Sequence, residues 1–177
     1  MIDIVQRDNP VLHAKAKDVA SSDIGTAKLA KILANMITAL DSQHDGIAIA
    51  APQIGVPLRI FIVSGTLLRQ ADPEYTGEAG HLVFINPTIT RLSREKNVVE
   101  EGCLSVRWLY GKVPRSVRAT VRALNEKGEK IERGASGLLA QIFQHEVDHL
   151  EGILFIDRAT DIWEMEEAEV EELKKKK

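Results

Sequence analysis

The sequence feature that most constrains the fold is the run QHEVDH at residues 144–149, which sits inside a longer apolar stretch. Apolar residues recur around this run at helical spacing, namely Leu138, Leu139, Ile142, Phe143, Val147 and Leu150. They predict a buried helix that Ser136 can cap and Gly152 can end. We therefore expect the rest of the chain to be organised around this helix.

Two histidines of the predicted helix have the spacing of a metal site. His145 and His149 are four residues apart, so their side chains lie on one face, one turn from each other, and can bind the same ion. Glu146 falls beside them. The alternative is a pair of histidines hydrogen-bonded in the core, with Glu146 facing solvent.

Length and composition fit one domain that spans residues 1–177. A chain of 177 residues with 44% hydrophobic residues can bury a core of its own. The net charge of -3 argues against a sequence-specific nucleic-acid binder and gives no sign of a membrane partner. The N-terminus has neither the basic start nor the apolar run of a signal peptide, so we expect a cytoplasmic protein.

The pattern along the chain predicts a strand-rich body before the central helix. Residues 1–22 form an extended arm, and a core helix runs from Ser22 or Asp23 to about Gln43. Strands are expected at residues 59–63, at 82–90 with an interruption at 86–87, at 97–104, and in a hairpin of 116–124 with 129–132. Residues 65–80 form a loop, and an acidic helix at 161–173 precedes four lysines.

The segment at residues 44–55 is rich in small side chains and carries one internal amide, Gln53. Small residues let another backbone or a ligand come close, so we expect this segment to form one wall of a binding site. An equal alternative is an ordinary strand of small residues with Gln53 on the surface.

The only cysteine, Cys103, follows Gly102, which lets the backbone turn tightly at the end of a strand. A thiolate with two imidazoles makes a three-ligand site with a fourth position open for water, the arrangement of a catalytic metal. Considered by itself, a lone cysteine is more often a small buried core residue.

In these three segments the sequence resembles the peptide deformylases, which carry the motifs GxGxAAPQ, EGCLS and QHExDHLxG in this order. The corresponding residues here are 46–53, 101–105 and 144–152. The resemblance implies an α+β fold, with antiparallel sheets packed around the central HExxH helix and a further helix near each terminus. It also implies removal of the N-formyl group from the initiator methionine of newly made polypeptides.

The resemblance further implies roles by position. The metal ligands would be Cys103, His145 and His149, holding one divalent ion, with Fe2+ expected and Zn2+, Ni2+ or Co2+ as substitutes. Glu146 would transfer protons, while Gln53 and the backbone N–H of Leu104 would bind the formyl oxygen. An apolar pocket and an edge strand would hold the formylmethionyl peptide, through Gly46, Ile47, Ala48, Ile49, Gly102, Leu138 and Ile142.

Two positions depart from the family pattern. Ala48 replaces the second glycine of the first motif and adds a methyl group where a substrate strand would approach, so we expect altered substrate fit. Tyr110 stands where the family often has an arginine that faces the substrate, and we assign that role to no residue. Arg107 or Trp108 could shape the outer pocket, or they could be a surface arginine and a half-buried tryptophan.

Two other functions stay open. One is a related HExxH metallohydrolase that cleaves another amide or peptide, and the other is a non-catalytic homologue that binds formylmethionyl chains or the ribosome. The lysines at residues 174–177 could contact ribosomal phosphate transiently, although a solvated tail is the simpler explanation.

Overall fold

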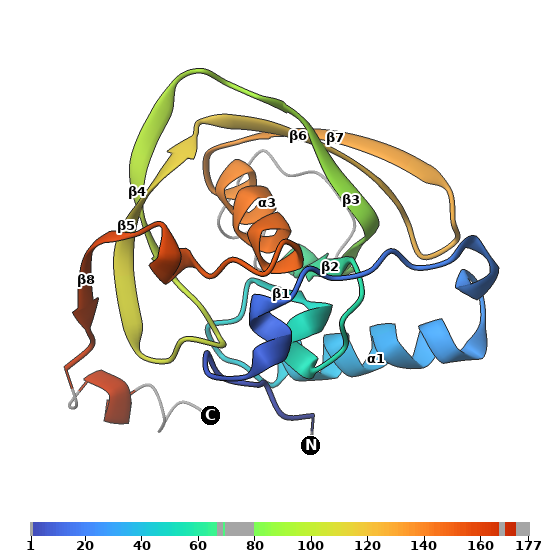
Figure 1. Ribbon diagram of the computed structural model, residues 1–177, viewed down its shortest axis with the longest axis horizontal. Coiled ribbons are helices and arrows are strands. Elements are labelled where there is room, and N and C mark those ends of the chain that lie inside the picture. The colour runs from blue at the N-terminus through green and yellow to red at the C-terminus, as the bar shows by residue number, and fades with distance from the viewer. Residues whose placement is uncertain (1, 67–68, 70–79, 167–168, 173–177) are drawn as a thin grey trace.

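The computed structural model describes residues 2–66, 69, 80–166 and 169–172 (Figure 1). Its long helices are α1 (Ala27–Asp41) and α3 (Gly137–Leu150). The strands are β1 (Ala48–Ala50), β2 (Ile60–Val63), β3 (Leu82–Leu92), β4 (Lys96–Gly102), β5 (Leu109–Ser116), β6 (Arg118–Leu124), β7 (Lys130–Ser136) and β8 (Thr160–Glu164). Short 3-10 helices lie at Pro10–His13, Ser21–Asp23, Ala51–Ile54 and Phe155–Asp157.

The strands form two antiparallel sheets around α3. One sheet has the order β1-β2-β3-β6-β7, and the other has the order β4-β5-β8. Figure 1 shows α3 at the centre, with the long strands arching over it and α1 below. The helix contacts strands of both sheets, including β1, β6 and β5. The predicted α+β architecture around a central helix is confirmed.

Three phenylalanines anchor α3 in the core. Phe143 of α3 is fully buried, and its ring lies edge-on to Phe84 of β3 and tilted against Phe61 of β2, with centroids 5.3 and 6.1 Å apart. Phe61 and Phe84 stack on each other at 4.5 Å. Each buried ring stabilises the fold by roughly 1.5–3 kcal/mol. These contacts fix the rotation of α3 and so decide which of its faces is left for a site.

The ends of α3 agree with the predicted residues only in part. Gly152 ends the helix as predicted: its φ is 76°, and its N–H donates to the carbonyl of His149 at 3.1 Å. Ser136 occupies the N-cap position, but its side chain makes no capping hydrogen bond, so that prediction is wrong. Gly137 also has a positive φ of 55°, a conformation that glycine adopts without steric cost.

Helix α1 begins later than predicted. The side-chain oxygen of Thr26 accepts the N–H of Leu29 at 3.3 Å and caps the helix. Ser22 and Asp23 belong instead to a separate 3-10 turn, so the prediction of either residue as the cap is wrong. The physical reason is Gly25, whose φ of 79° breaks the helical path between the two elements.

Strand β3 continues through Asn86–Pro87 rather than stopping there. The register with β6 shifts between Ile85 and Thr88, which accommodates the proline as an irregularity in the ladder. Asn86 has a φ of 52°, and its side-chain amide exchanges two hydrogen bonds with the backbone of Val19, at 2.8 and 2.9 Å. Asparagine tolerates this backbone conformation better than most residues, and its amide ties the N-terminal arm to the sheet.

Two strands were not predicted from the local pattern. β5 contains Pro114, a residue that disfavours strands, and β8 occupies the start of the predicted acidic helix. β8 pairs with β5, and Trp163 stacks on Tyr110 with ring centroids 6.1 Å apart. Pairing with the open edge of β5 outweighs a weak helical propensity. The C-terminal helical residues described by the structure are therefore 169–172, and the predicted span of 161–173 is too long.

The N-terminal arm lies over the body, as predicted, although it contains two 3-10 turns. Leu12 is fully buried, and Lys17 forms an isolated parallel bridge with Leu58. The predicted loop at 65–80 lies largely outside the described residues, and the lysines at 174–177 lie entirely outside them. Among the helices that the structure describes, none is both long enough and apolar enough to cross a membrane.

Candidate metal centre and active site

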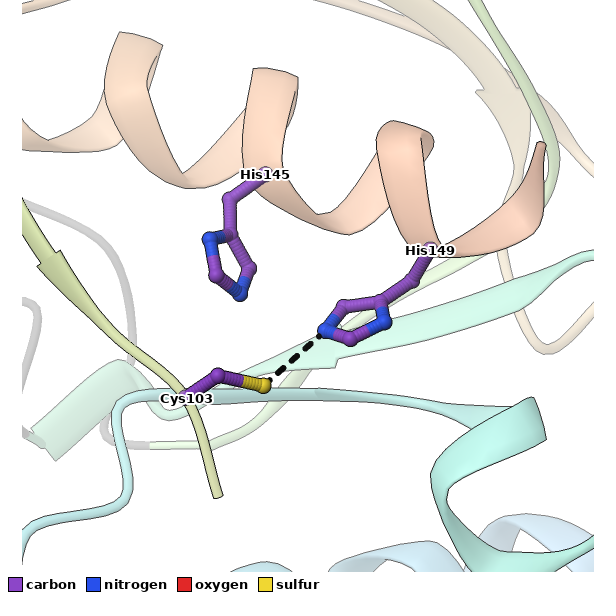
Figure 2. A group of neighbouring side chains, drawn as sticks. All are labelled: Cys103, His145 and His149. Atoms are coloured by element: carbon purple, nitrogen blue, oxygen red, sulfur yellow. Dashed lines mark hydrogen bonds between the residues drawn. The ribbon is translucent and has the colours of Figure 1, made fainter. Parts of the chain in front are cut away.

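The structure brings together the cysteine and two histidines that the sequence singled out. Cys103 follows β4, and His145 and His149 project from one face of α3 toward its sulfur (Figure 2). One ligand atom from each residue lies within 4.8 Å of the other two. The Cys103 Sγ is 3.2 Å from the His149 Nε2, and the imidazole centroids are 4.9 Å apart. A sulfur and two ring nitrogens can therefore hold one ion.

Gly102, next to Cys103, leaves room for the ring of Tyr110. A Cβ on residue 102 would lie 2.6 Å from Tyr110 Cε1, so a larger residue would displace that ring. Glycine lets the Tyr110 ring cover the end of the strand.

A buried carboxylate orients His145. Glu101 Oε2 lies 2.9 Å from His145 Nδ1, and the same carboxylate accepts hydrogen bonds from Arg115 at 2.7 and 2.9 Å. Arg115 also donates to Asp148 at 2.6 Å. Burial raises the pKa of Glu101, but the hydrogen bonds from Arg115 and His145 outweigh it and lower the pKa to about 2. The ionised carboxylate makes Nδ1 a donor and leaves Nε2 for the site.

The histidines and Glu146 have the properties of a site that a cation completes. Burial lowers the pKa of His145, but hydrogen bonds to Cys103 and Glu101 raise it well above its ordinary value. A cation among the same groups would take the place of that proton. Burial lowers the pKa of His149 well below 6.5, so this ring is neutral, the form that binds metal. Cys/His/His ligation suits zinc and iron, and the residues present fit such an ion.

Glu146 is buried beside this group, with only 4% of its surface exposed. Among the described residues, its Oε2 has no hydrogen-bond partner. Burial raises the pKa of Glu146 to about 7, with His145 lowering it and Glu101 raising it further. A carboxyl group with this pKa can both accept and donate a proton near neutral pH. The alternative of a solvent-facing glutamate is wrong.

Gln53 is also buried, with 1% of its surface exposed, so its alternative placement on the surface is wrong. Its Oε1 accepts the N–H of Ala50 at 2.8 Å, which fixes the orientation of the amide. The amide Nε2 donates to Ser105 Oγ at 3.2 Å and lies 3.5 Å from Cys103 Sγ. The donor end of Gln53 therefore faces the Cys/His/His group.

A cavity of about 300 Å3 opens onto these residues. Five of the residues expected to hold the peptide line the cavity, namely Ile47, Ala48, Gly102, Leu138 and Ile142. It is also lined by Gln53, Cys103, Leu104, His145 and Glu146. Gly46 and Ile49 do not line it. The Ile49 side chain is fully buried in a core cluster with residues of α1, so only its backbone could face a ligand.

The family model described as polypeptide deformylase matches residues 1–164. The chain belongs to this family. The peptide deformylase of Desulforudis audaxviator is 39% identical over 93% of this chain and 97% of its own length. The peptide deformylase of Natranaerobius thermophilus is 42% identical over 91% of this chain and 94% of its own length. The enzyme is therefore a hydrolase that removes the N-formyl group from nascent polypeptides, and it depends on a metal ion as its family does.

Solved deformylases share its fold. A class I type b peptide deformylase from Acinetobacter baumannii, bound to Met-Ala-Ser, matches 89% of this enzyme and 99% of its own chain, with a TM-score of 0.78 and 34% identity. The peptide deformylase from Thermotoga maritima matches 90% of this enzyme and 98% of its own chain, with a TM-score of 0.77 and 36% identity.

The sequence did not assign roles to several residues that complete the enzyme's site. Glu101 lies inside the EGCLS motif, but its contact with His145 cannot be predicted from the spacing of the two residues. Arg115 could have been suspected, because alternation along β5 places it on the buried side with Val113, where an arginine needs partners. Tyr110, at the position of the family's arginine, lines the cavity.

Proposed function

We propose that Cys103, His145 and His149 hold the divalent metal of this deformylase, with Fe2+ as the expected ion. The observation that supports this most directly is the convergence of their three ligand atoms within 4.8 Å. Zn2+, Ni2+ and Co2+ suit the same ligands. When bound, the ion would supply Lewis-acid activation of water and of the formyl group.

Glu146 is the residue we propose for proton transfer. Its buried carboxylate has a pKa of about 7, so it can take a proton from the attacking water and deliver it to the amine that leaves. Its oxygen without a partner is free to make the hydrogen bond that this step needs.

The proposed donors to the formyl oxygen are the Gln53 amide and the backbone N–H of Leu104. Negative charge develops on this oxygen as water attacks, and fixed neutral donors stabilise it more than they stabilise the substrate. The bond from Ala50 holds the Gln53 amide in place beforehand, so little reorganisation is required.

For the methionine side chain we propose the apolar part of the cavity, formed by Ile47, Leu138 and Ile142, with Gly102 beside it. Burial of a thioether there would contribute roughly 1.5–3 kcal/mol to binding. The peptide backbone would run along residues 46–49, because β1 is the end strand of its sheet among the strands that the structure describes. The Met-Ala-Ser bound to the Acinetobacter baumannii relative is a peptide of this kind. Ala48, which lines the cavity, would narrow this path.

Residues 1–177 would act as one catalytic domain in the cytoplasm, where formylated chains are made. A contact between the terminal lysines and the ribosome stays a prediction from the sequence.

The test is elemental analysis of anaerobically purified protein together with release of formate from a formylmethionyl tripeptide. We expect about one metal ion per chain and formate release in the wild type. Cys103→Ala should lose both, whereas His81→Ala, which removes a histidine paired with Asp41, should keep both. No formate release with iron or nickel fully bound would reject the proposal. Faster turnover of acetylated or internal peptides would favour another metallohydrolase, and tight binding without turnover would favour a non-catalytic homologue.

A further inference from the structure

An ion pair between Asp45 and Arg107 bridges two walls of the cavity. The guanidinium of Arg107 donates to both carboxylate oxygens of Asp45, at 2.5 and 3.0 Å. It also donates to the side-chain oxygen of Gln43 at 3.0 Å. Both charged residues line the cavity. The pair therefore joins the segment before β1 to the turn between β4 and β5.

The joined segments carry residues of the proposed site. Asp45 precedes Ile47 by two positions, and Arg107 follows Cys103 by four. A turn closes inside the second segment, because the N–H of Val106 donates to the carbonyl of Cys103 at 3.0 Å. Because these connections are short, the ion pair can set how far apart the two segments lie.

Arg107 is held on its other sides as well. Its guanidinium lies 4.8 Å from the centre of the Trp108 ring, and its backbone N–H donates to Gln6 at 3.5 Å. Only 18% of the Arg107 side chain is exposed. Partial burial raises the pKa of Asp45, but the hydrogen bonds and charge of Arg107 outweigh it and hold the pKa below 3.8. The contact is thus a charged, bidentate one, the strongest form of an arginine–carboxylate pair.

We propose that Asp45 and Arg107 form a positioning pair that sets the separation of the two cavity walls and thereby the affinity for the peptide substrate. This inference rests on the proposed function of the cavity as the peptide site. Three hydrogen bonds from Arg107 go to Asp45 and Gln43, which makes the guanidinium part of the walls. Loss of the pair would leave the reacting groups, Glu146 and Gln53, in place.

A double-mutant cycle of Asp45→Ala and Arg107→Ala in the metal-loaded enzyme tests the inference. Each single variant should raise KM for formyl-Met-Ala-Ser by about threefold to tenfold, with kcat within about twofold of the wild type. The double variant should be no worse than either single variant, because all three lose the same contact. The swapped variant D45R/R107D should recover part of the loss.

Two results would overturn the proposal. If Asp45→Ala lowers KM while Arg107→Ala raises it, the released guanidinium binds the peptide itself. If the two effects on KM multiply in the double variant, the residues act independently. The matched control is the pair of Arg122 and Glu132 on β6 and β7, 2.6 Å apart and exposed, whose removal should leave KM unchanged.

Binding of the deformylated product Met-Ala-Ser separates this inference from the proposed function. With Trp163→Phe as the background, Trp108 is the only tryptophan, and its fluorescence can follow peptide binding at the wall that carries Arg107. The product affinity should fall in each single variant by the factor by which KM rises, whether or not formate is released. Equal affinities in all variants would reject the positioning role, while formate release by the wild type would still support the proposed function.

Discussion

Glu101 and His145 are joined by a contact of 2.9 Å between the carboxylate Oε2 and the ring Nδ1, with 2% of the Glu101 side chain and 13% of the His145 side chain exposed. The carboxylate is fixed in turn by Arg115. Removal of such an outer partner of a metal-binding histidine typically weakens metal binding, because the ring loses its orientation and part of its basicity.

We therefore expect Glu101→Gln to lower metal affinity by about 10- to 100-fold. Competition with a chelator of known affinity, followed by elemental analysis, measures this change. Glu95→Gln, at an exposed position before β4, is the control and should bind metal like the wild type. Equal affinities for Glu101→Gln and the wild type would show that the carboxylate does not support the metal.

Glu146→Gln should separate metal binding from catalysis. The substitution keeps the volume of the side chain but removes its ability to accept a proton, so kcat should fall by about 10^2- to 10^4-fold. The metal content should stay at the wild-type value, because Glu146 is not among the proposed ligands. Activity within tenfold of the wild type, in fully loaded protein, would contradict the proton-transfer role.

Gln53→Met should remove the proposed side-chain donor to the formyl oxygen. We expect kcat to fall by about 10^2- to 10^3-fold with a smaller change in KM, because the donor acts mainly in the transition state. The folded fraction must be measured by circular dichroism, since Ala50 loses its acceptor. Ser105→Ala removes the neighbour of the Gln53 amide but leaves the donor, and a loss there as large as in Gln53→Met would refute the donor role.

Phe143→Ala should destabilise the fold by about 3–5 kcal/mol, because it leaves a cavity beside the stacked rings of Phe61 and Phe84. Urea unfolding of the metal-free protein measures this loss without a contribution from metal binding. Leu92→Ala removes a leucine that is 51% exposed, and it should change the free energy of unfolding by less than about 0.5 kcal/mol. Similar losses in the two variants would show that the aromatic cluster does not anchor α3.

Asp45 gives a dependence of stability on pH. The pKa of Asp45 in the folded protein lies below its unfolded value of 3.8. The ionised carboxylate therefore stabilises the fold at a pH above the unfolded pKa, and this stabilisation is lost as the pH falls through the pKa of the folded protein. The free energy of unfolding of the wild type should exceed that of Asp45→Asn by at most about 1 kcal/mol at neutral pH, since the pair is partly exposed. The difference should shrink as the pH falls below the unfolded pKa of 3.8.

Arg107→Gln removes the partner of Asp45. When Asp45→Asn is added to Arg107→Gln, most of the pH-dependent difference in the free energy of unfolding should therefore disappear. Chemical unfolding at several pH values measures both variants. A difference between the wild type and Asp45→Asn that grows as the pH falls would contradict the expected direction.

The proposed metal ligands were accessible from the sequence because their relation is local or chemical. His145 and His149 share one helical face by spacing, and the helix is marked by its apolar pattern. Cys103 is distant along the chain, but it is the only thiol, and its chemistry completes the ligand set. The hairpin of β6 and β7 was accessible for the same reason, since its turn and both strands lie within 20 residues.

Contacts that depend on distant partners could not be predicted. The edge of β5 turns residues 160–164 into a strand, although their neighbours favour a helix. Asn86 keeps β3 continuous because the arm at Val19 satisfies its amide, and no local pattern contains that partner.

By itself the sequence determined the residue types of the proposed metal site, the central helix that carries two of them, and the family. The tertiary structure decided which buried charges face one another, namely Glu101 with His145 and Arg115, and Asp45 with Arg107. The physical reason is that helical and strand periodicity act over a few residues, whereas the pKa of a carboxylate and the partner of a guanidinium depend on groups that only folding brings within hydrogen-bonding distance.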